Sequence, residues 1–454
     1  MSGRTAGAEV AIVGGGFCGI ALALQLLHRP DYAGRVVLLE PAPALGGVAY
    51  TTEQPRHLLN VPADRMSLFP DQPNDFLRFA EEAGIAEPSR QFLPRPLYGA
   101  YLKARLAEAV ANAPGRFVWE RRTVQAVRPS GGGWQVTADG RALQADVVVL
   151  ATGNGPPIVP GPLRALGPHP AVVTEPYLPG ALAAIDRAAP VLVLGMRLTA
   201  IDILESLEAQ GHTGPVYALS RRARWPAEHL PEVRWSGALP MLGPEPEPLT
   251  ADGLAAWFRA AVEAAAVAGI PWQAVADAVR PRVQRLWQRL DAEERAALLS
   301  RHRGSWEWVR HRVPAACAEA LRRWEKAGWL RPVAGEVVAA SVIADGLNVT
   351  LRTPEGAESQ LPFGAVICGA GRLSDPRKFG GPLWRQLLSD GLVRADADGL
   401  GLLATAAGEV SGAPAGLFAV GSLLRPALYE STAVPELASQ CALLAERICG
   451  GAAE

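Results

Sequence analysis

The feature that most limits what this 454-residue chain can fold into lies close to its start. An apolar run over 10–13 predicts a buried strand, and the leucine-rich segment 20–27 predicts a helix. Between them stand three glycines in the order G-x-G-x-x-G, namely Gly14, Gly16 and Gly19. A second apolar run, RVVLLE, ends in Glu40, roughly twenty residues after the last glycine. This combination is typical of a dinucleotide-binding unit, in which the loop and the helix N-terminus bind a pyrophosphate and the acid binds ribose hydroxyls.

A second unit of the same kind begins with the segment VLVLGMRLTAID, but its glycine loop is altered. Gly195 and Ala200 hold the first and third glycine-type positions, whereas Arg197 holds the second. The second glycine normally lets the backbone approach the pyrophosphate closely. Two interpretations remain open. In one, Arg197 pairs with a phosphate and NADPH binds in a shifted pose; in the other, the side chain fills the pyrophosphate position and the domain is only a scaffold.

The strand that follows this loop favours the first interpretation. It ends in three polar residues, Ser220, Arg221 and Arg222. Arginine at this place suits the 2′-phosphate of NADP better than the free hydroxyl of NAD. Arginines at a strand end can equally be ordinary surface charge.

The order of predicted strands and helices indicates an α/β chain with two dinucleotide-binding, Rossmann-like domains. We expect a discontinuous FAD-binding domain over 1–160 and 361–454, and an NAD(P)-binding-like domain over 161–248 and 331–360. Residues 249–330 have helical periodicity and hold seven of the twelve tryptophans, which predicts an inserted helical subdomain with tryptophan in its core.

Composition excludes several other classes of protein. The formal net charge is −1, so no global field recruits nucleic acid or a membrane surface. No apolar run is long enough for a membrane span, and the first apolar run is a strand rather than part of a signal peptide. The five cysteines include no C-x-x-C pair, which argues against a disulfide framework. We expect a cytoplasmic protein without a bound metal, whose chemistry is done by an organic cofactor.

Further motifs resemble flavoproteins that bind two dinucleotides. In those proteins FAD occupies the first site, a strand ending in A-T-G closes the first half, and a C-terminal strand ending in G-D lies on the flavin side. Here the first motif is Ala151-Thr152-Gly153, and the second is Gly421-Ser422, with serine in place of aspartate. The resemblance therefore implies that the first site binds FAD.

Three longer segments resemble a narrower group: GGVAYTTEQPRHLLNVPADRMSLFPDQPNDFLRF, SWEWVRHRVP and LYESTAVPELASQCALLAERI. They look like bacterial FAD/NAD(P)-binding proteins, mostly uncharacterised, that are related to flavin-dependent N-hydroxylating monooxygenases. The group's second loop reads G-x-G-L-T-A, which this chain keeps at Gly195, Thr199 and Ala200 but not at Arg197. The resemblance places the following residues against FAD: His57, Asn60, Val61, Met66 and Ser67 along the flavin and its phosphates, Val124 at the adenine through its backbone, and Ala433 and Pro435 at the isoalloxazine end.

The resemblance implies an FAD-dependent oxidoreductase. We expect an NADPH-dependent monooxygenase in which a flavin C4a-hydroperoxide passes one oxygen atom of O2 to a small amine, amino acid or similar nucleophile. Two alternatives remain: an FAD oxidase or dehydrogenase reduced by its own substrate without NADPH, and a flavin-binding scaffold without turnover. Oxygen uptake that depends on NADPH distinguishes the first from the other two.

The segment SWEWVRHRVP supplies the candidate substrate site. It combines an aromatic surface with cations directly before a proline. Such a segment can bind a carboxylate or a phosphate by charge-assisted hydrogen bonds. We expect Trp306 to contact the substrate and His311 and Arg312 to act in catalysis; the alternative is that Trp306 belongs to the core and the cations are solvated.

Overall fold

The computed structural model describes residues 7–230 and 240–450. Its first domain is built on five parallel strands, in the order β3 (Phe117–Glu120), β2 (Val36–Leu39), β1 (Val10–Val13), β7 (Val147–Leu150) and β16 (Leu417–Ala419). Successive side chains of a strand point to opposite faces of the sheet. Both faces are buried here, which is why the strands read as continuous apolar runs.

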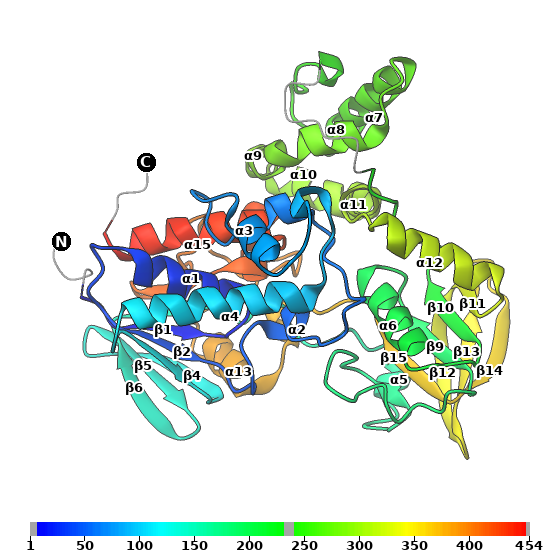
Figure 1. The fold of residues 1–454 in the computed structure, drawn as a ribbon, viewed down its shortest axis with the longest axis horizontal. Coiled ribbons are helices and arrows are strands. Elements are labelled where there is room, and N and C mark those ends of the chain that lie inside the picture. The colour runs from blue at the N-terminus through cyan, green and yellow to red at the C-terminus, as the bar shows by residue number, and fades with distance from the viewer. Residues whose placement is uncertain (1–6, 231–239, 451–454) are drawn as a thin grey trace.

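Two different layers cover the first sheet. One face packs against three helices, α1 (Phe17–His28), α4 (Arg95–Asn112) and α15 (Val434–Ile448), which lie side by side in Figure 1. The other face packs against an antiparallel sheet of β4 (Val124–Ser130), β5 (Gly133–Ala138) and β6 (Arg141–Ala145), together with α13 (Gly381–Ser389).

The second domain repeats this design. Its parallel sheet has the order β11 (Leu330–Ala334), β10 (Val216–Ser220), β9 (Val191–Leu194), β15 (Ala365–Cys368) and β8 (Val172–Val173). One face packs against α6 (Leu198–Ala209) and α12 (Ala315–Lys326), and the other against the antiparallel sheet of β12 (Glu336–Ile343), β13 (Gly346–Arg352) and β14 (Glu358–Phe363). The expected α/β fold with two dinucleotide-binding domains is confirmed.

Two of the expected domain limits differ from the structure. We expected the chain to return to the first domain at 361, but β15 pairs with β9 inside the second sheet. We expected α12 to belong to the helical insert, but its apolar side packs on the second sheet through Leu321 and Trp324. Helical periodicity identifies a helix without saying which surface it covers, so only packing separates α12 from the insert.

The helical insert consists of α7 (Ala251–Val267), α8 (Trp272–Val279), α9 (Val283–Arg289), α10 (Ala292–Ala297) and α11 (Arg303–Arg310). It projects from the rest of the molecule where the two domains meet (Figure 1). Thr250 and Asp291 cap α7 and α10 by accepting hydrogen bonds from backbone N–H groups. Trp287 is buried in its core, as the expected tryptophan-rich interior requires.

Short helices complete the layers: α2 (Gly47–Tyr50), α3 (Asp75–Glu82), α5 (Gly161–Arg164) and α14 (Arg425–Leu428). Among the described residues, no helix has both the length and the apolar character needed to cross a membrane.

Candidate functional site

The first glycine loop joins β1 to α1, and its three glycines have different tasks. Gly14 has a φ of +113°, and a Cβ atom there would lie 2.4 Å from the carbonyl oxygen of Ala151. A Cβ atom on Gly19 would lie 2.0 Å from the carbonyl oxygen of Gly14. At Gly16, by contrast, the nearest atom to a Cβ is 3.9 Å away. The protein's own packing thus requires the outer two glycines, while the space at Gly16 is left for a ligand at the N-terminus of α1.

Glu40 lies beside this loop in the expected position. One oxygen of its carboxylate accepts a hydrogen bond from the N–H of Gly15 at 2.8 Å, and the other accepts from the N–H of Ala42 at 2.9 Å. These bonds fix the orientation of the carboxylate. Each oxygen keeps a further lone pair that can accept a ribose hydroxyl.

Buried polar atoms without a partner occur directly after two strands of the first sheet. Among the described residues, these include the hydroxyls of Thr152, after β7, and of Ser422, after β16. The hydroxyl of the fully buried Ser431 and the side-chain N–H2 of Gln440 also lack partners. Leaving a buried polar group unpaired costs roughly 1–3 kcal/mol, so such a group calls for a partner. The polar atoms present fit a dinucleotide such as FAD.

His57 does not lie open to a flavin as we expected. Its Nδ1 is 2.8 Å from the hydroxyl of Thr52, and its Nε2 is 2.9 Å from both the hydroxyl of Ser206 and the carbonyl of Asp202. The last two residues belong to α6 of the second domain. Burial lowers the pKa of His57, so the ring is neutral and acts as a polar joint between the domains. The sequence could not indicate this partner because it is about 145 residues away.

Three of the next four expected flavin residues, Val61, Met66 and Ser67, have side chains that are buried in the protein's own structure. Ser67 donates a hydrogen bond to the carbonyl of Gln72 at 2.7 Å, and the side chains of Met66 and Val61 are buried. The backbone carbonyl of Asn60 accepts a hydrogen bond from His229 at 3.1 Å. Contacts of Ser67 and Met66 with a cofactor would therefore be made through their backbone atoms.

The remaining first-domain candidates lie on strand ends and on α15. Val124 begins β4, and its side chain is buried in the core, which leaves its backbone as the group that can meet an adenine. Gly153 and Gly421 have left-handed backbones, with φ of +68° and +79°. Ala433 and Pro435 form the N-cap and the first turn of α15. Their contacts with FAD stay predictions.

The second glycine loop has the shape of the first. Gly195 has a φ of +100°, and a Cβ atom there would lie 2.5 Å from the carbonyl oxygen of Gly369, which mirrors the close approach at Gly14. Arg197 is the N-cap of α6 with a φ of −118°, which any residue can adopt. The arginine therefore fits this loop without backbone strain.

Arg197 has a partner that the sequence did not suggest. Its guanidinium lies 2.6 Å from the carboxylate of Glu307 on α11, and its side chain is 49% exposed. Glu307 also accepts a hydrogen bond from Arg303 at 2.8 Å. Burial alone would raise the pKa of Glu307, but Arg303 and Arg197 lower it, so the carboxylate is charged. The second dinucleotide loop is thus tied to the helical insert.

The other candidates for NADPH lie at the end of β10 and at the start of α6. Ser220 donates to the sulfur of Met196 at 3.3 Å, beneath the loop. Arg221 and Arg222 are exposed side by side, and Thr199 is in the first turn of α6. That these residues bind NADPH stays a prediction.

In the segment SWEWVRHRVP, we expected His311 and Arg312 to be cations available for catalysis, but neither is a free cation in the structure. Arg312 is buried and pairs with Asp277 of α8. Burial lowers the pKa of His311, whose Nδ1 is 3.1 Å from the carbonyl of Glu307, so this ring is neutral. Trp306 donates from Nε1 to the carboxylate of Glu430 at 2.9 Å. Trp306 lines two neighbouring cavities, and Arg312 lines the smaller of them.

The smaller cavity, of about 40 Å³, is lined by more cationic than anionic side chains. It lies between the segment 60–65 and the insert, and its lining includes five arginines: Arg65, Arg90, Arg280, Arg310 and Arg312. Asp277 lines it too, and Glu436 and Glu430 pair with Arg280 and Arg310. Of these arginines only Arg312 was predicted from the sequence as a site residue, because the charges come from four distant segments and form no local motif.

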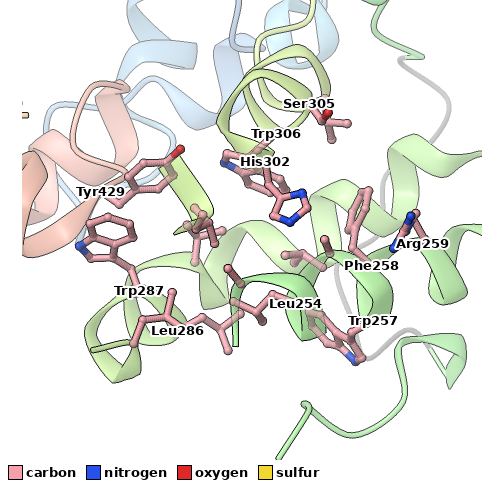
Figure 2. A pocket seen from close by; sticks show the side chains of 17 residues that line it. Leu254, Trp257, Phe258, Arg259, Leu286, Trp287, His302, Ser305, Trp306 and Tyr429 are labelled. Carbon is pink, nitrogen blue, oxygen red and sulfur yellow. The ribbon is translucent and has the colours of Figure 1, made fainter. Parts of the chain in front are cut away.

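The larger cavity, of about 270 Å³, is lined mostly by apolar and aromatic side chains of the insert. Figure 2 shows Tyr429 and Trp287 together at one side, with Phe258 and Trp257 across from them. Tyr429 comes from the first domain, directly after α14. No cluster of potential metal ligands occurs in the described ranges 7–230 and 240–450.

Comparisons with known proteins agree with this architecture. Residues 11–155 match the FAD-NAD(P)-binding family. No curated protein matches the sequence. Among solved structures, the ornithine N-hydroxylase of Kutzneria sp. 744 is 17% identical with a TM-score of 0.64, over 97% of this chain and 99% of that chain. The cadaverine monooxygenase of Erwinia amylovora is 15% identical with a TM-score of 0.68, over 97% and 94%. A bacillithiol disulfide reductase of Staphylococcus aureus is 14% identical with a TM-score of 0.56, over 99% and 98%.

Likeness at such identities defines a fold and not a reaction. Residues 11–155 thus resemble the FAD-NAD(P)-binding family, and 97% of the chain shares its two-domain fold with the ornithine N-hydroxylase and the cadaverine monooxygenase.

Proposed function

We propose that this protein is an FAD-dependent monooxygenase that is reduced by NADPH and oxygenates a small amine, amino acid or similar nucleophile. The observation that carries the proposal is the pair of glycine loops, at Gly14 and Gly195, with the same left-handed backbone and the same close approach to a neighbouring strand end. Two such loops in one chain are what electron transfer from one dinucleotide to another needs. FAD, when bound, supplies the redox chemistry.

The chain's own part is to bind and orient. The space at Gly16 and the N-terminus of α1 hold the pyrophosphate of FAD, and Glu40 accepts its ribose hydroxyls. The hydroxyls of Thr152 and Ser422, buried and unpaired among the described residues, hydrogen-bond to the same cofactor.

On the NADPH side, Arg221 and Arg222 bind the 2′-phosphate, and Arg197 exchanges Glu307 for a phosphate oxygen. A partly exposed ion pair is worth roughly 0.2–1 kcal/mol. A hydrogen bond to a charged ligand group contributes roughly 1.5–3 kcal/mol. The exchange is therefore favourable, and it supports binding of NADPH despite the missing glycine.

The cationic cavity supports an acidic group on the substrate. One water needs roughly 10–15 Å³ of cavity volume, so the volume of about 40 Å³ has room for about three heavy atoms, which is the scale of a single carboxylate. Arginine binds carboxylates through two parallel hydrogen bonds. Among the candidate substrates, this favours an amino acid. Trp306, at the edge of the cavity, contacts the substrate in this proposal, while Arg312 and His311 position α11 rather than react.

The test is anaerobic mixing of the purified protein with NADPH or NADH while the flavin absorbance is followed. We expect NADPH to bleach the flavin faster than NADH, and an amine to stimulate oxygen uptake and hydroxylamine formation. Arg197→Gly should speed reduction, because it restores the close backbone approach. Glu307→Gln is the matched variant that frees Arg197 without removing it. If neither nucleotide reduces the flavin in wild type or in Arg197→Gly, the role of NADPH is wrong.

One observation favours a second candidate, an FAD oxidase or dehydrogenase reduced by its own substrate. Arg197 and Glu307 together occupy the mouth of the second loop, as expected of a domain that has become a scaffold. Bleaching of the flavin by substrate in the absence of NADPH would establish this candidate. A flavin-binding scaffold would show neither reaction.

We also propose a cytoplasmic location. All five cysteines are free, as in a chain that stays in a reducing compartment. Fractionation of cells that produce the protein tests this.

A further inference from the structure

The larger cavity of the helical insert has the size and lining of a binding site for an apolar group. Its volume is about 270 Å³. An apolar cavity of roughly 150 Å³ is enough to bind benzene. The walls are the rings of Trp257, Phe258, Trp287, Trp306 and Tyr429 (Figure 2), with aliphatic side chains between them. A space of this size and chemistry accommodates one or two fused rings.

The rings that form the walls are held in place by their own contacts. Trp287 and Tyr429 stack with ring centroids 4.7 Å apart, and Phe258 meets Trp306 edge to face at 6.1 Å. Trp287 also donates from Nε1 to the carbonyl of Pro426 at 2.9 Å. The first domain and the insert are thus locked together at the cavity, which is preorganised rather than left by loose packing.

Two further observations about Tyr429 indicate a ligand-binding site. Its backbone has a φ of +57°, which is unusual for a bulky side chain and is found where surrounding structure enforces it. Its hydroxyl is buried, with no hydrogen-bond partner among the described residues. Burial raises the pKa of Tyr429 to about 12, so the hydroxyl stays protonated at neutral pH, and its oxygen can accept a hydrogen bond from an ammonium group. A ligand with one polar group on an apolar body would satisfy it.

The cavity adjoins the region where the proposed function places the reaction. Trp306 and Val309 line both this cavity and the cationic one. The chain runs from Tyr429 through Glu430, which accepts from Trp306, directly into the N-terminus of α15. A molecule can therefore place an apolar body against Tyr429 while its polar end lies beside Trp306.

We propose that this cavity binds the apolar body of the substrate, so that the substrate class is an amine with an aromatic or branched aliphatic body rather than a polar diamine. That the ligand is the substrate rests on the proposed function. Its binding to the cavity needs neither NADPH nor turnover and can be measured separately.

The first experiment measures binding by calorimetry and by quenching of tryptophan fluorescence, with the purified flavoprotein. The probes are phenylalanine and tryptophan, which carry the carboxylate that the cationic cavity would bind, together with 2-phenylethylamine and tryptamine, which lack it. The polar comparison is cadaverine, which carries an amine without an aromatic body. We expect the aromatic amines to bind at least tenfold more tightly. Equal or weaker binding than cadaverine overturns the inference, and this comparison depends on no variant.

A pair of neighbouring positions on α7 localises the site. Ala255 lines the cavity, whereas Ala256 is exposed and does not line it. Ala255→Phe should weaken binding of 2-phenylethylamine at least tenfold, while Ala256→Phe should leave it unchanged. Tyr429→Phe keeps the stacked ring and removes only the hydroxyl, so it should weaken the amines severalfold. Wild-type affinity in Ala255→Phe, with the variant folded by circular dichroism, places the binding elsewhere and refutes the site.

The two proposals fail in different ways. If aromatic amines bind here but stimulate no oxygen uptake with NADPH, the cavity stands and the monooxygenase proposal falls. If cadaverine or ornithine is oxygenated and aromatic amines neither bind nor react, the monooxygenase proposal stands and the cavity inference falls.

Discussion

His229 lies where the two domains and the insert meet, and its charge state should control the response of the protein to acid. Its Nε2 donates to the carbonyl of Asn60 at 3.1 Å, and its ring packs on Phe92 at 4.8 Å. Burial, followed by the charge of Arg312, lowers the pKa of His229 from 6.5 to about 3. The ring therefore stays neutral in the folded protein at pH values where it is protonated in the unfolded chain.

The sign and size of the effect follow from linkage. Because the pKa of His229 is lower in the folded state, its contribution to stability is complete above the unfolded value of 6.5 and is lost as the pH falls toward 3. At pH 5.5 the protonated form of His229 outnumbers the neutral form about ten to one in the unfolded chain. This protonation stabilises the unfolded state by about 1.4 kcal/mol. At pH 7.5 the same quantity is below about 0.1 kcal/mol. The figure depends on the unfolded pKa alone, since pH 5.5 lies far above the folded one.

The assay is urea unfolding at pH 7.5 and pH 5.5, followed by circular dichroism and flavin fluorescence. His229→Gln keeps a donor for the carbonyl of Asn60 and cannot titrate. Between the two pH values, the wild type should lose about 1.4 kcal/mol more free energy of unfolding than the variant. The other buried histidines affect both proteins alike. Phe92→Leu is the control: it should lower stability at both pH values and leave the pH dependence unchanged. An equal loss in wild type and His229→Gln would refute the reasoning.

Three further predictions concern the cofactor loops and the insert. Gly19→Ala places a Cβ atom 2.0 Å from a backbone oxygen, so it should destabilise the protein by roughly 1–3 kcal/mol. It should also reduce the FAD content, which absorbance measures. Full FAD occupancy at unchanged stability would contradict this prediction. Arg221→Ala combined with Arg222→Ala should weaken NADPH binding roughly tenfold or more, because the lost contacts are worth about 1.5–3 kcal/mol. Binding of NADH should not change, and titration with each nucleotide measures both affinities. Equal losses for both nucleotides would count against a 2′-phosphate site. Arg312→Met leaves the buried carboxylate of Asp277 unpaired and should lower the free energy of unfolding by roughly 3–5 kcal/mol. The double variant with Asp277→Leu should recover most of the lost stability. No loss in the single variant would mean that the pair is not buried in solution.

Much of the fold could be predicted because it is written in local patterns. The strand at 10–13 and the helix after it, predicted over 20–27 and observed as Phe17–His28, have the predicted character, since a buried parallel strand reads as a short apolar run and a buried helix as a longer one. The outer glycines of each loop are dictated by contacts with neighbouring strand ends, so their spacing is also a local signal. The domain to which α12 and β15 belong was not predicted, because an element joins the layer whose surface it packs against, and the sequence does not show that surface.

Site residues divide in the same way. Glu40 was found because it ends a strand at a fixed distance from the loop, and its carboxylate indeed reaches that loop. His57 was assigned from resemblance to a cofactor contact, yet its ring is bound by α6. Arg312 was taken as a free cation, yet it is neutralised by Asp277. Sequence shows which groups carry charge, but a charge is available only if packing leaves it unpaired.

The sequence by itself determined that this chain has two dinucleotide-binding units and that the second has an arginine where a glycine is usual. Both are properties of short segments, in which backbone geometry and residue type are directly linked. Only the tertiary structure decided what that arginine meets, and that five arginines and an aromatic cavity face each other across Trp306. Those contacts arise where the helical insert packs against the segments around residues 60 and 429, which are far apart in the chain, and no local pattern encodes such a meeting.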